Sequence, residues 1–235
     1  MAGRGSHGSG RRRARREGIV VVEGSAGEVE HLVGLLRGPE EEAAGAYVGS
    51  LVRCGRPVGA LYLGLLTQAA RHFGELWERD ECDFFEVTLA VGRIQRLVGR
   101  LRTEFAAAGR DGDAVGRILL VCVPGEQHTL GLSILAEYFV RAGWSVELGG
   151  SFGLAPGLNR LGRSWYDVLG FSVSRSDSLC RVTRAIARAR KESLNPALRV
   201  LVGGQVVLDR PALVEEMGAD GTGADAELAL ASAHA

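Results

Sequence analysis

From residue 117 onward, short apolar runs bounded by glycine and proline alternate with helix-like stretches, and no other pattern limits the possible folds as strongly. Strands that alternate with helices in this way are typical of a parallel sheet covered by helices on both faces. The segment 117–235 is therefore expected to be an α/β domain. The expected strands are 117–123, 144–148, 166–173, 198–202 and, more weakly, 217–221, and the expected helices are 130–142, 156–163, 178–192, 211–216 and 225–233.

The first half of the chain follows a different pattern. Between about residues 26 and 108, apolar residues recur at spacings of three and four, which is the period of an amphipathic helix. Glycine-containing breaks divide this region into four stretches, so we expect a four-helix bundle over 26–108. Residues 109–116 are polar and are expected to link the bundle to the α/β domain.

The N-terminal residues 1–25 are expected to form a disordered basic arm. Six arginines but only one acidic residue, Glu17, lie among the first 17 residues, and this stretch contains almost no apolar side chains. Such an arm is either a solubilising tail or a segment that contacts DNA phosphates or an acidic partner. The formal net charge of the whole chain is zero, so overall charge favours neither nucleic acid nor membrane as a partner.

Two absences narrow the class of protein further. The sequence has no uninterrupted run of about eighteen apolar residues and no secretory pattern, so we expect a cytoplasmic protein without a membrane span. Its four cysteines form no CxxC pair, which argues against a zinc or iron–sulfur centre.

Candidate ligand-binding residues lie in the loops that follow the expected strands. Ligands of open parallel sheets bind beyond the carboxyl ends of the strands. The loop after the first strand contains Glu126 and His128, the loop after the third begins with Ser172 and Ser174, and the fourth strand ends at the pair Gly203-Gly204. Together these loops offer an imidazole, a carboxylate, two hydroxyls and a backbone free of side chains.

In order and spacing, these loops resemble the cobalamin-binding domain of the methionine-synthase type. That family carries an Asp-x-His-x-x-Gly loop, a Ser-x-Leu segment and a Gly-Gly pair, and the resemblance covers about residues 115–232. It implies a Rossmann-like fold of the flavodoxin type. The matching segments here are Glu126-Gln127-His128-Thr129-Leu130-Gly131, Ser172-Val173-Ser174 and Gly203-Gly204. Ser172 follows His128 by 44 positions, and Gly203 follows Ser172 by 31. A final stretch, 218–223, includes Thr222 and resembles the last strand and turn of the family.

The resemblance also implies how the cofactor is held. Cobalamin would bind with its own benzimidazole displaced from cobalt (base-off), and His128 would replace it as the lower ligand (His-on). Glu126 would fix the second imidazole nitrogen, as carboxylates commonly do for metal-bound histidine. Haem stays open as an alternative cofactor, because His128 could hold either metal. The other cofactor-binding residues that the motifs imply are Gln127, Thr129, Gly131, Ser172, Val173, Ser174, Gly203, Gly204 and Thr222.

The expected bundle contains a Leu-Trp element, Leu76-Trp77, like that of the helical bundles that cap cobalamin in light-sensing regulators. In those proteins the tryptophan covers the upper face of the corrin ring, and Trp77 matches its position. This chain departs from the light-sensing repressors at two places. Glu78 replaces the histidine that directly follows their tryptophan, and Val87-Thr88 replaces their Glu-His pair, so ligation of cobalt by two histidines is in doubt.

The bundle sequence resembles most closely the AerR/PpaA-type antirepressors, which lack a DNA-binding domain. This resemblance implies a light- or redox-responsive regulator that acts through a transcriptional repressor, with possible DNA contact by the arm and possible homo-oligomerisation, rather than an enzyme. The alternative is a corrinoid subunit that carries a methyl group for a methyltransferase. Carriers usually have aspartate at the position of Glu126 and lysine at that of Leu132, and these departures favour a sensor.

Overall fold

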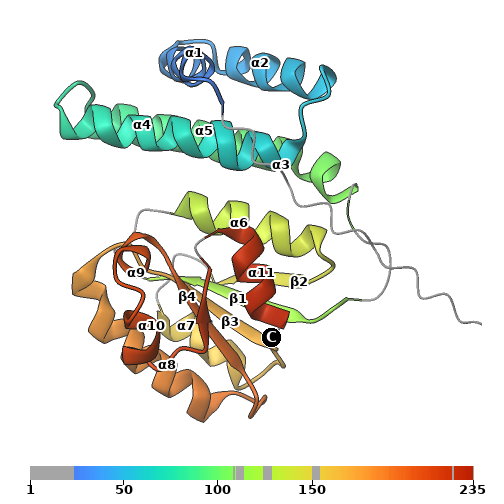
Figure 1. The fold of residues 1–235 in the computed structure, drawn as a ribbon, viewed down its shortest axis with the longest axis vertical. Coiled ribbons are helices and arrows are strands. Elements are labelled where there is room, and N and C mark those ends of the chain that lie inside the picture. Colours follow the sequence, from blue (N-terminus) through green and yellow to red (C-terminus); the bar gives the residue numbers. More distant parts are fainter. Residues whose placement is uncertain are drawn as a thin grey trace, which may run out of the picture.

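Residues 26–107 fold into helices. The computed structural model describes residues 24–107, 109, 114–123, 129–149, 154–223 and 225–234. Its first segment contains α1 (Ala26–Arg37), α2 (Glu41–Arg53), α3 (Val58–Ala60), the π-helical stretch η1 (Leu61–Leu66), α4 (Thr67–Glu78) and α5 (Phe84–Ala107). Helix α3 runs through η1 into α4 without a break, so four rods make up this part, with α1 and α2 forming a layer above α4 and α5 (Figure 1).

Two of these helices begin at capping boxes that the local sequence encodes. The Ser25 hydroxyl accepts a hydrogen bond from the Glu28 N–H at 3.3 Å, and the Glu28 carboxylate accepts one from the Ser25 N–H at 2.9 Å. Asp83 and Glu86 make the same reciprocal pair at the start of α5, at 2.8 and 3.0 Å. Each box satisfies backbone N–H groups that have no partner within the helix, and so fixes where α1 and α5 begin.

The second half forms a five-stranded parallel sheet. Its strands lie in the order β2-β1-β3-β4-β5, which is the order of flavodoxin-type sheets. The central strands are buried on both faces, as their unbroken apolar sequences require. The strand bounds are β1 (Arg117–Cys122), β2 (Ser145–Gly149), β3 (Val168–Ser172), β4 (Arg199–Gly203) and β5 (Gly221–Thr222).

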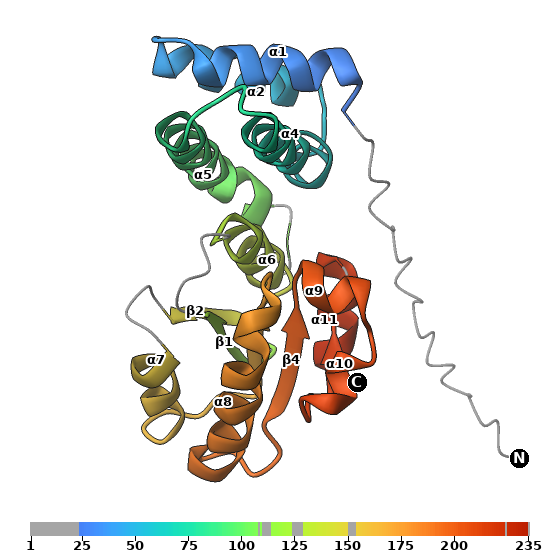
Figure 2. The ribbon, with the colours of Figure 1, turned by 90° about the vertical axis from the view of Figure 1, so that its left-hand side faces the viewer.

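Helices cover both faces of this sheet (Figure 2). On the face toward the bundle lie α6 (Thr129–Arg141) and α11 (Ala226–His234), and on the other face lie α7 (Leu154–Leu161) and α8 (Leu179–Glu192). The short helix η2 (Ser176–Ser178) leads into α8. Two further short helices, α9 (Gln205–Asp209) and α10 (Leu213–Glu216), add Val207 and Leu213 to the core beside α7 and α8.

Helix α6 is buried on two sides and joins the two halves of the molecule. Leu132 and Phe139 pack with Ile118 and other residues on the sheet, whereas Ile134 and Tyr138 belong to the core of the bundle. Successive residues of a helix are rotated by about 100°, so residues two positions apart, such as Leu132 and Ile134, point to nearly opposite sides. One helix can therefore contribute to both cores. A helix that is apolar on most of its circumference is expected in such a central position.

Three polar contacts connect the bundle to α6. The Tyr138 hydroxyl donates to the Gly59 carbonyl at 3.2 Å, Gln95 donates to the Thr129 hydroxyl at 2.7 Å, and Arg102 pairs with Glu137 at 2.7 Å. Glu137 is only 3% exposed although it is charged, so its ion pair with Arg102 offsets part of the cost of its burial. Burial also raises the pKa of Tyr138 far above its usual value, and its hydroxyl therefore stays a donor.

The expected fold class is confirmed: a helical bundle precedes a Rossmann-like parallel sheet. The expected strand at 217–221 is displaced, because β5 begins only at Gly221. Residues 217–218 instead form the turn after α10, where Gly218 has a φ of +74°, which favours glycine over other residues. Within the described residues, no helix combines the length and the apolar character needed to cross a membrane.

The expected arm and linker lie largely outside the described residues. Of the arm, the structure describes Gly24 and Ser25, and the Gly24 N–H donates to the Gly64 carbonyl at 3.3 Å. Of the linker, it describes residue 109 and residues 114–116, where Val115 bonds to Gly143 beside the start of β2.

Candidate functional site

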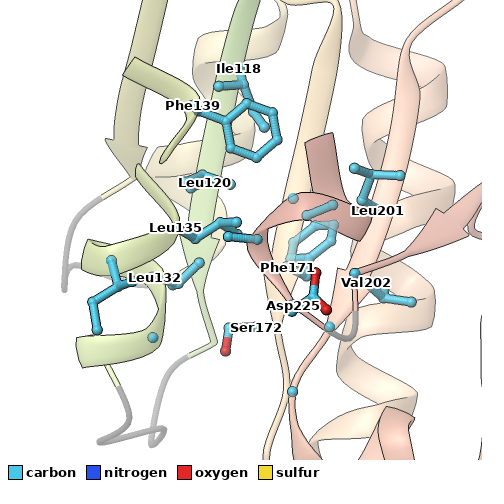
Figure 3. A pocket seen from close by; sticks show the side chains of 18 of the residues that line it. Ile118, Leu120, Leu132, Leu135, Phe139, Phe171, Ser172, Leu201, Val202 and Asp225 are labelled. Atoms are coloured by element: carbon cyan, nitrogen blue, oxygen red, sulfur yellow. The ribbon is translucent and has the colours of Figure 1, made fainter. Parts of the chain in front are cut away.

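A cavity of about 380 Å³ lies between α6 and α11, above the central strands of the sheet (Figure 3). Helix α4 of the bundle also contributes to its wall, so the cavity touches both halves of the chain. The lining residues are Leu63, Thr67 and Arg71 from the bundle, Ile118, Leu120, Gly170, Phe171, Ser172 and 201–204 from the strands and their ends, Gly131, Leu132, Ile134, Leu135 and Phe139 from α6, and Gly223, Asp225, Ala226 and Ala229 near α11.

The cavity is apolar at one end and polar at the other. Helix α6 runs antiparallel to the strands, because it connects the parallel neighbours β1 and β2. Phe139 therefore lies with Ile118 toward the amino ends of the strands, whereas Ser172 lies at the carboxyl end of β3 (Figure 3). Asp225, at the start of α11, adds a carboxylate near this polar end. We call the apolar end the base of the cavity and the polar end its mouth.

Two glycines at the mouth have different surroundings. Gly204 has a φ of +109°, and a Cβ atom there would lie 2.2 Å from the carbonyl oxygen of Val173. This close approach holds the end of β4 against the end of β3, where the Val173 N–H also donates to the Gly203 carbonyl at 2.8 Å. At Gly131, by contrast, an added Cβ would meet no atom within 4 Å, so the missing side chain leaves open space.

Four of the residues that the motifs implied line this one cavity. Gly131, Ser172 and the pair Gly203-Gly204 come from three separate segments of the sequence, and the structure brings them together at the mouth. Glu126, Gln127 and His128 lie outside the described residues, so the expected metal ligand and its carboxylate partner stay predictions.

The other implied residues lie near the cavity without lining it. Thr129 begins α6 and its hydroxyl is bonded to Gln95, while the Val173 side chain is buried in the core on the α7–α8 side of the sheet. Ser174 follows directly and is partly buried. The hydroxyl of Thr222, on β5, is buried without a hydrogen-bond partner among the described residues. Trp77, on α4, is 54% exposed.

Several lining residues were not anticipated from the sequence. Leu63, Thr67 and Arg71 are spaced by four residues, which places them on one side of a helix, but nothing in the sequence shows what that side faces. Gly170 lies inside β3, where a Cβ atom would come within 2.7 Å of Leu120. A glycine inside a buried strand is a recognisable sign of a close approach, and it could have been used.

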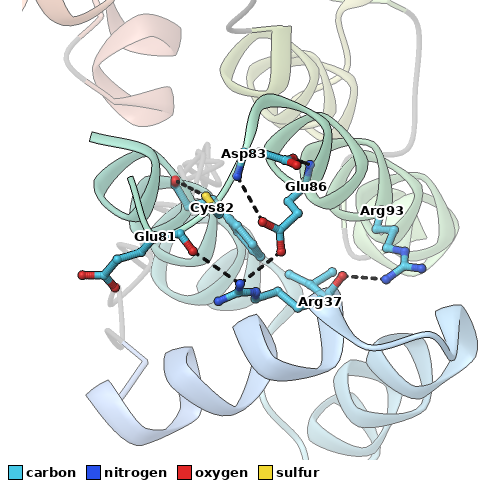
Figure 4. Close-up of polar contacts among 8 residues, drawn as sticks. Arg37, Glu81, Cys82, Asp83, Glu86 and Arg93 are labelled. Carbon is cyan, nitrogen blue, oxygen red and sulfur yellow. Dashed lines mark hydrogen bonds and ion pairs between the residues drawn. The ribbon is translucent and has the colours of Figure 1, made fainter. Parts of the chain in front are cut away.

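The turn between α4 and α5 is fixed to α1 by a set of polar contacts (Figure 4). Arg37 donates to the Glu86 carboxylate at 3.0 Å and to the Glu81 carbonyl at 3.5 Å. Arg93 donates to the carbonyl oxygens of Leu36 and Gly38, at 2.6 and 2.7 Å. These contacts fix the α4–α5 turn and the first half of α5 to the C-terminal end of α1.

Large aromatic side chains are exposed beside this turn. Trp77, Phe84 and Phe85 are 54%, 58% and 71% exposed. Phe84 precedes Gln95 by eleven residues, close to three helical turns, so both lie on the side of α5 that faces α6. The turn lies at the end of the molecule where β4 leads into α9 (Figure 1), and Phe84 follows this turn as the first residue of α5.

Comparisons with known proteins agree on the class of this domain. Residues 116–231 match the family model of the B12 binding domain. The chain is 32% identical over 169 residues to an uncharacterised 20.5 kDa protein from the bchF–crtJ intergenic region of Rhodobacter capsulatus, covering 70% of this chain and 85% of the relative. It is 25% identical over 150 residues to a corrinoid protein of Desulfitobacterium hafniense, covering 63% and 68%.

A solved structure shares the arrangement of both halves. The monomethylamine corrinoid protein of Methanosarcina barkeri superposes with a TM-score of 0.73 over 88% of this chain and 98% of that chain. The two sequences are 15% identical, so this similarity establishes the fold.

The cavity fits the nucleotide tail of cobalamin, which carries an aromatic base at one end and a ribose phosphodiester nearer the corrin ring. At the apolar end of the cavity, Ile118 and Phe139 can pack against the aromatic group of the tail. At the mouth, Ser172 offers a hydroxyl and the glycine pair leaves free space. A volume of about 380 Å³ lies within the usual range of about 300–1,000 Å³ for ligand pockets. The chain therefore belongs to the family of cobalamin-binding proteins with a B12-binding domain, joined here to an N-terminal helical bundle.

Proposed function

We propose that this protein is a light-responsive transcriptional regulator, an antirepressor that acts through a repressor protein. The observation that carries this proposal is the similarity to the Rhodobacter capsulatus protein of the bchF–crtJ intergenic region, which is 32% identical over 85% of its length. Bound cobalamin would supply a cobalt–carbon bond that visible light cleaves.

The residues of this chain would hold the cofactor between its two halves. His128 would bind cobalt from below, and Glu126 would orient its imidazole ring. Ser172 and Ser174 would bind the tail beside Gly203 and Gly204, as the mouth of the cavity suggests. Gln127, Thr129, Val173 and Thr222 would contribute through their backbone or their hydroxyl groups.

The aromatic side chains beside the α4–α5 turn support a role in sensing. Trp77 and Phe84 are exposed near the carboxyl ends of the strands, where the corrin ring of a tail-bound cofactor would lie. Trp77 would cover the upper face of that ring. A change of the group bound above cobalt would then act directly on α4 and α5.

Helix α6 would transmit this change. The bundle contacts α6 through Gln95, Arg102 and Gly59, so any shift of α4 and α5 must alter these three contacts. A switch requires that the two states of the cofactor stabilise two arrangements of the bundle by different amounts. The altered bundle surface would bind the repressor in one state.

The arginine-rich arm could add contacts to DNA, and two copies of the chain could assemble.

A second function, a methyl carrier for a methyltransferase, is favoured by one specific observation. The Methanosarcina barkeri monomethylamine corrinoid protein has both a bundle and a sheet in the same arrangement. A carrier would exchange methyl groups with a partner enzyme, whereas the proposed regulator would not.

Absorption spectra before and after illumination test the proposal. Protein loaded in the dark with methyl-, adenosyl- or hydroxocobalamin is expected to show a lasting spectral change in light with at least one alkyl form. Hydrogen exchange is expected to increase at the contact between α5 and α6 in the illuminated state, because the Gln95–Thr129 and Arg102–Glu137 contacts there would rearrange. The His128→Ala variant is expected to lose or alter this response.

The His31→Ala variant is the matched control. His31 is exposed on α1 and its ring packs against Tyr47, so its loss is expected to leave the spectra unchanged. Spectra that return fully to the dark form, together with methyl transfer to and from bound cobalt, would contradict the regulator and support the carrier.

A further inference from the structure

Arg71 is a cation at the cavity that has no hydrogen bond or ion pair within the part of the chain that the structure describes. The bundle residues that line the cavity with it, Leu63 on η1 and Thr67 on α4, are uncharged. Asp225 lines the same cavity, yet these two residues form no ion pair with each other. The guanidinium group is therefore available to a ligand.

The contacts between the bundle and α6 place Arg71 at the mouth. Gly59 contacts Tyr138, near the end of α6, whereas Gln95 contacts Thr129, at its beginning. The rod formed by α3, η1 and α4 therefore runs from the base of the cavity, at Gly59, toward its mouth, and Arg71 lies nearer the mouth. Eight residues of helix separate Leu63 from Arg71, which corresponds to about 12 Å along the axis.

Other features of the mouth also favour an anion. Helices α6 and α11 both begin there, and the N-terminus of a helix carries partial positive charge and free N–H groups. Asp225 offsets part of this charge at α11, because its carboxylate accepts the Leu228 N–H at 2.8 Å. Asp225 is the one acidic side chain among the described residues that line the cavity.

We propose that Arg71 binds the phosphodiester of the cobalamin nucleotide tail. With the aromatic base of the tail at Ile118 and Phe139, the phosphodiester lies toward the mouth, and it is the one anionic group of the tail. The proposal rests on cobalamin binding in this cavity but not on light sensing. Because Arg71 belongs to α4, this contact would attach the bundle to the cofactor independently of cobalt ligation.

Cobinamide, which lacks the phosphodiester, ribose and base, allows a direct test. The Arg71→Ala variant is expected to bind hydroxocobalamin about tenfold more weakly than the wild type, since a charge-assisted contact is lost, while its affinity for aquocobinamide stays the same. Arg71→Lys is expected to retain most of the cobalamin affinity. Arg79→Ala serves as the control, because Arg79 directly follows α4, pairs with Glu75 and does not line the cavity.

Salt dependence provides a second measurement. The difference in cobalamin affinity between wild type and Arg71→Ala is expected to shrink at high salt, because Arg71 is exposed and an ionic contact at an exposed site is screened. Thermal unfolding of the cofactor-free variants is expected to match the wild type. An unchanged cobalamin affinity in Arg71→Ala, an equal loss for cobalamin and cobinamide, or a loss independent of salt would overturn the proposal.

The outcome is separable from that of the proposed function. Arg71→Ala protein saturated with an alkylcobalamin is expected to keep its lasting response to light. If the light response is absent in the wild type while Arg71 still discriminates cobalamin from cobinamide, only the proposed regulator fails.

Discussion

Replacing Gly131 with leucine is expected to lower cobalamin affinity about a hundredfold while leaving the cofactor-free protein as stable as the wild type. Gly131 lies in the first turn of α6 and lines the cavity, and a Cβ atom there would meet nothing within 4 Å. A leucine therefore fits the folded protein but occupies space that the nucleotide tail needs. Overpacking of this kind costs roughly 1–3 kcal/mol, which corresponds to about five- to 150-fold in affinity.

Titration of hydroxocobalamin measured by absorption, together with thermal unfolding, checks this prediction. The matched control is Gly34→Leu on α1, because Gly34 is exposed, has the same open surroundings and lies away from the cavity. Wild-type affinity in Gly131→Leu would show that the tail does not enter this cavity.

Replacing Gly204 with alanine is expected to destabilise the fold by about 3 kcal/mol or more. The φ of +109° strains any residue with a Cβ atom, at a cost of about 1–3 kcal/mol. The added carbon would also lie 2.2 Å from the Val173 carbonyl oxygen, so β3 and β4 would have to separate at the mouth. Since a domain is stable by about 5–15 kcal/mol, this loss is a large fraction of the total.

Urea unfolding monitored by circular dichroism gives the change in the free energy of unfolding. Gly203→Ala is the matched control at the adjacent position, because its Cβ atom would lie 3.3 Å from the Gly223 carbonyl oxygen, and a small shift relieves this contact. Equal stabilities for the two variants would mean that the close approach at Gly204 does not hold the mouth together.

The layers of the fold could be predicted from the sequence because each half has one clear period. The unbroken apolar runs predicted buried parallel strands, and the order of β-strands and helices then left few possible topologies. The position of β5 was missed because Met217 is buried, which gives its segment the apolar look of a strand although it closes a turn. Burial alone does not distinguish these two structures.

The candidate site was predictable only in part. Ser172, Gly203 and Gly204 end neighbouring strands, so topology alone brings them to one edge of the sheet. The contribution of Arg71 depends on how the bundle sits over α6, and the spacing of residues within α4 contains no information on that. The second apolar side of α6 signals that a further layer exists, but not which helix of that layer reaches the cavity.

Electron paramagnetic resonance of the protein loaded with cob(II)alamin tests most directly whether His128 replaces the cofactor's own base. In protein labelled with ¹⁵N-histidine, the nitrogen splitting of the cobalt signal is expected to change from a triplet to a doublet, because ¹⁴N has nuclear spin 1 and ¹⁵N has spin ½. The doublet is expected to disappear in His128→Ala. A triplet that persists in the labelled protein would show that the benzimidazole stays on cobalt, and it would contradict the tail-in-cavity binding on which this account depends.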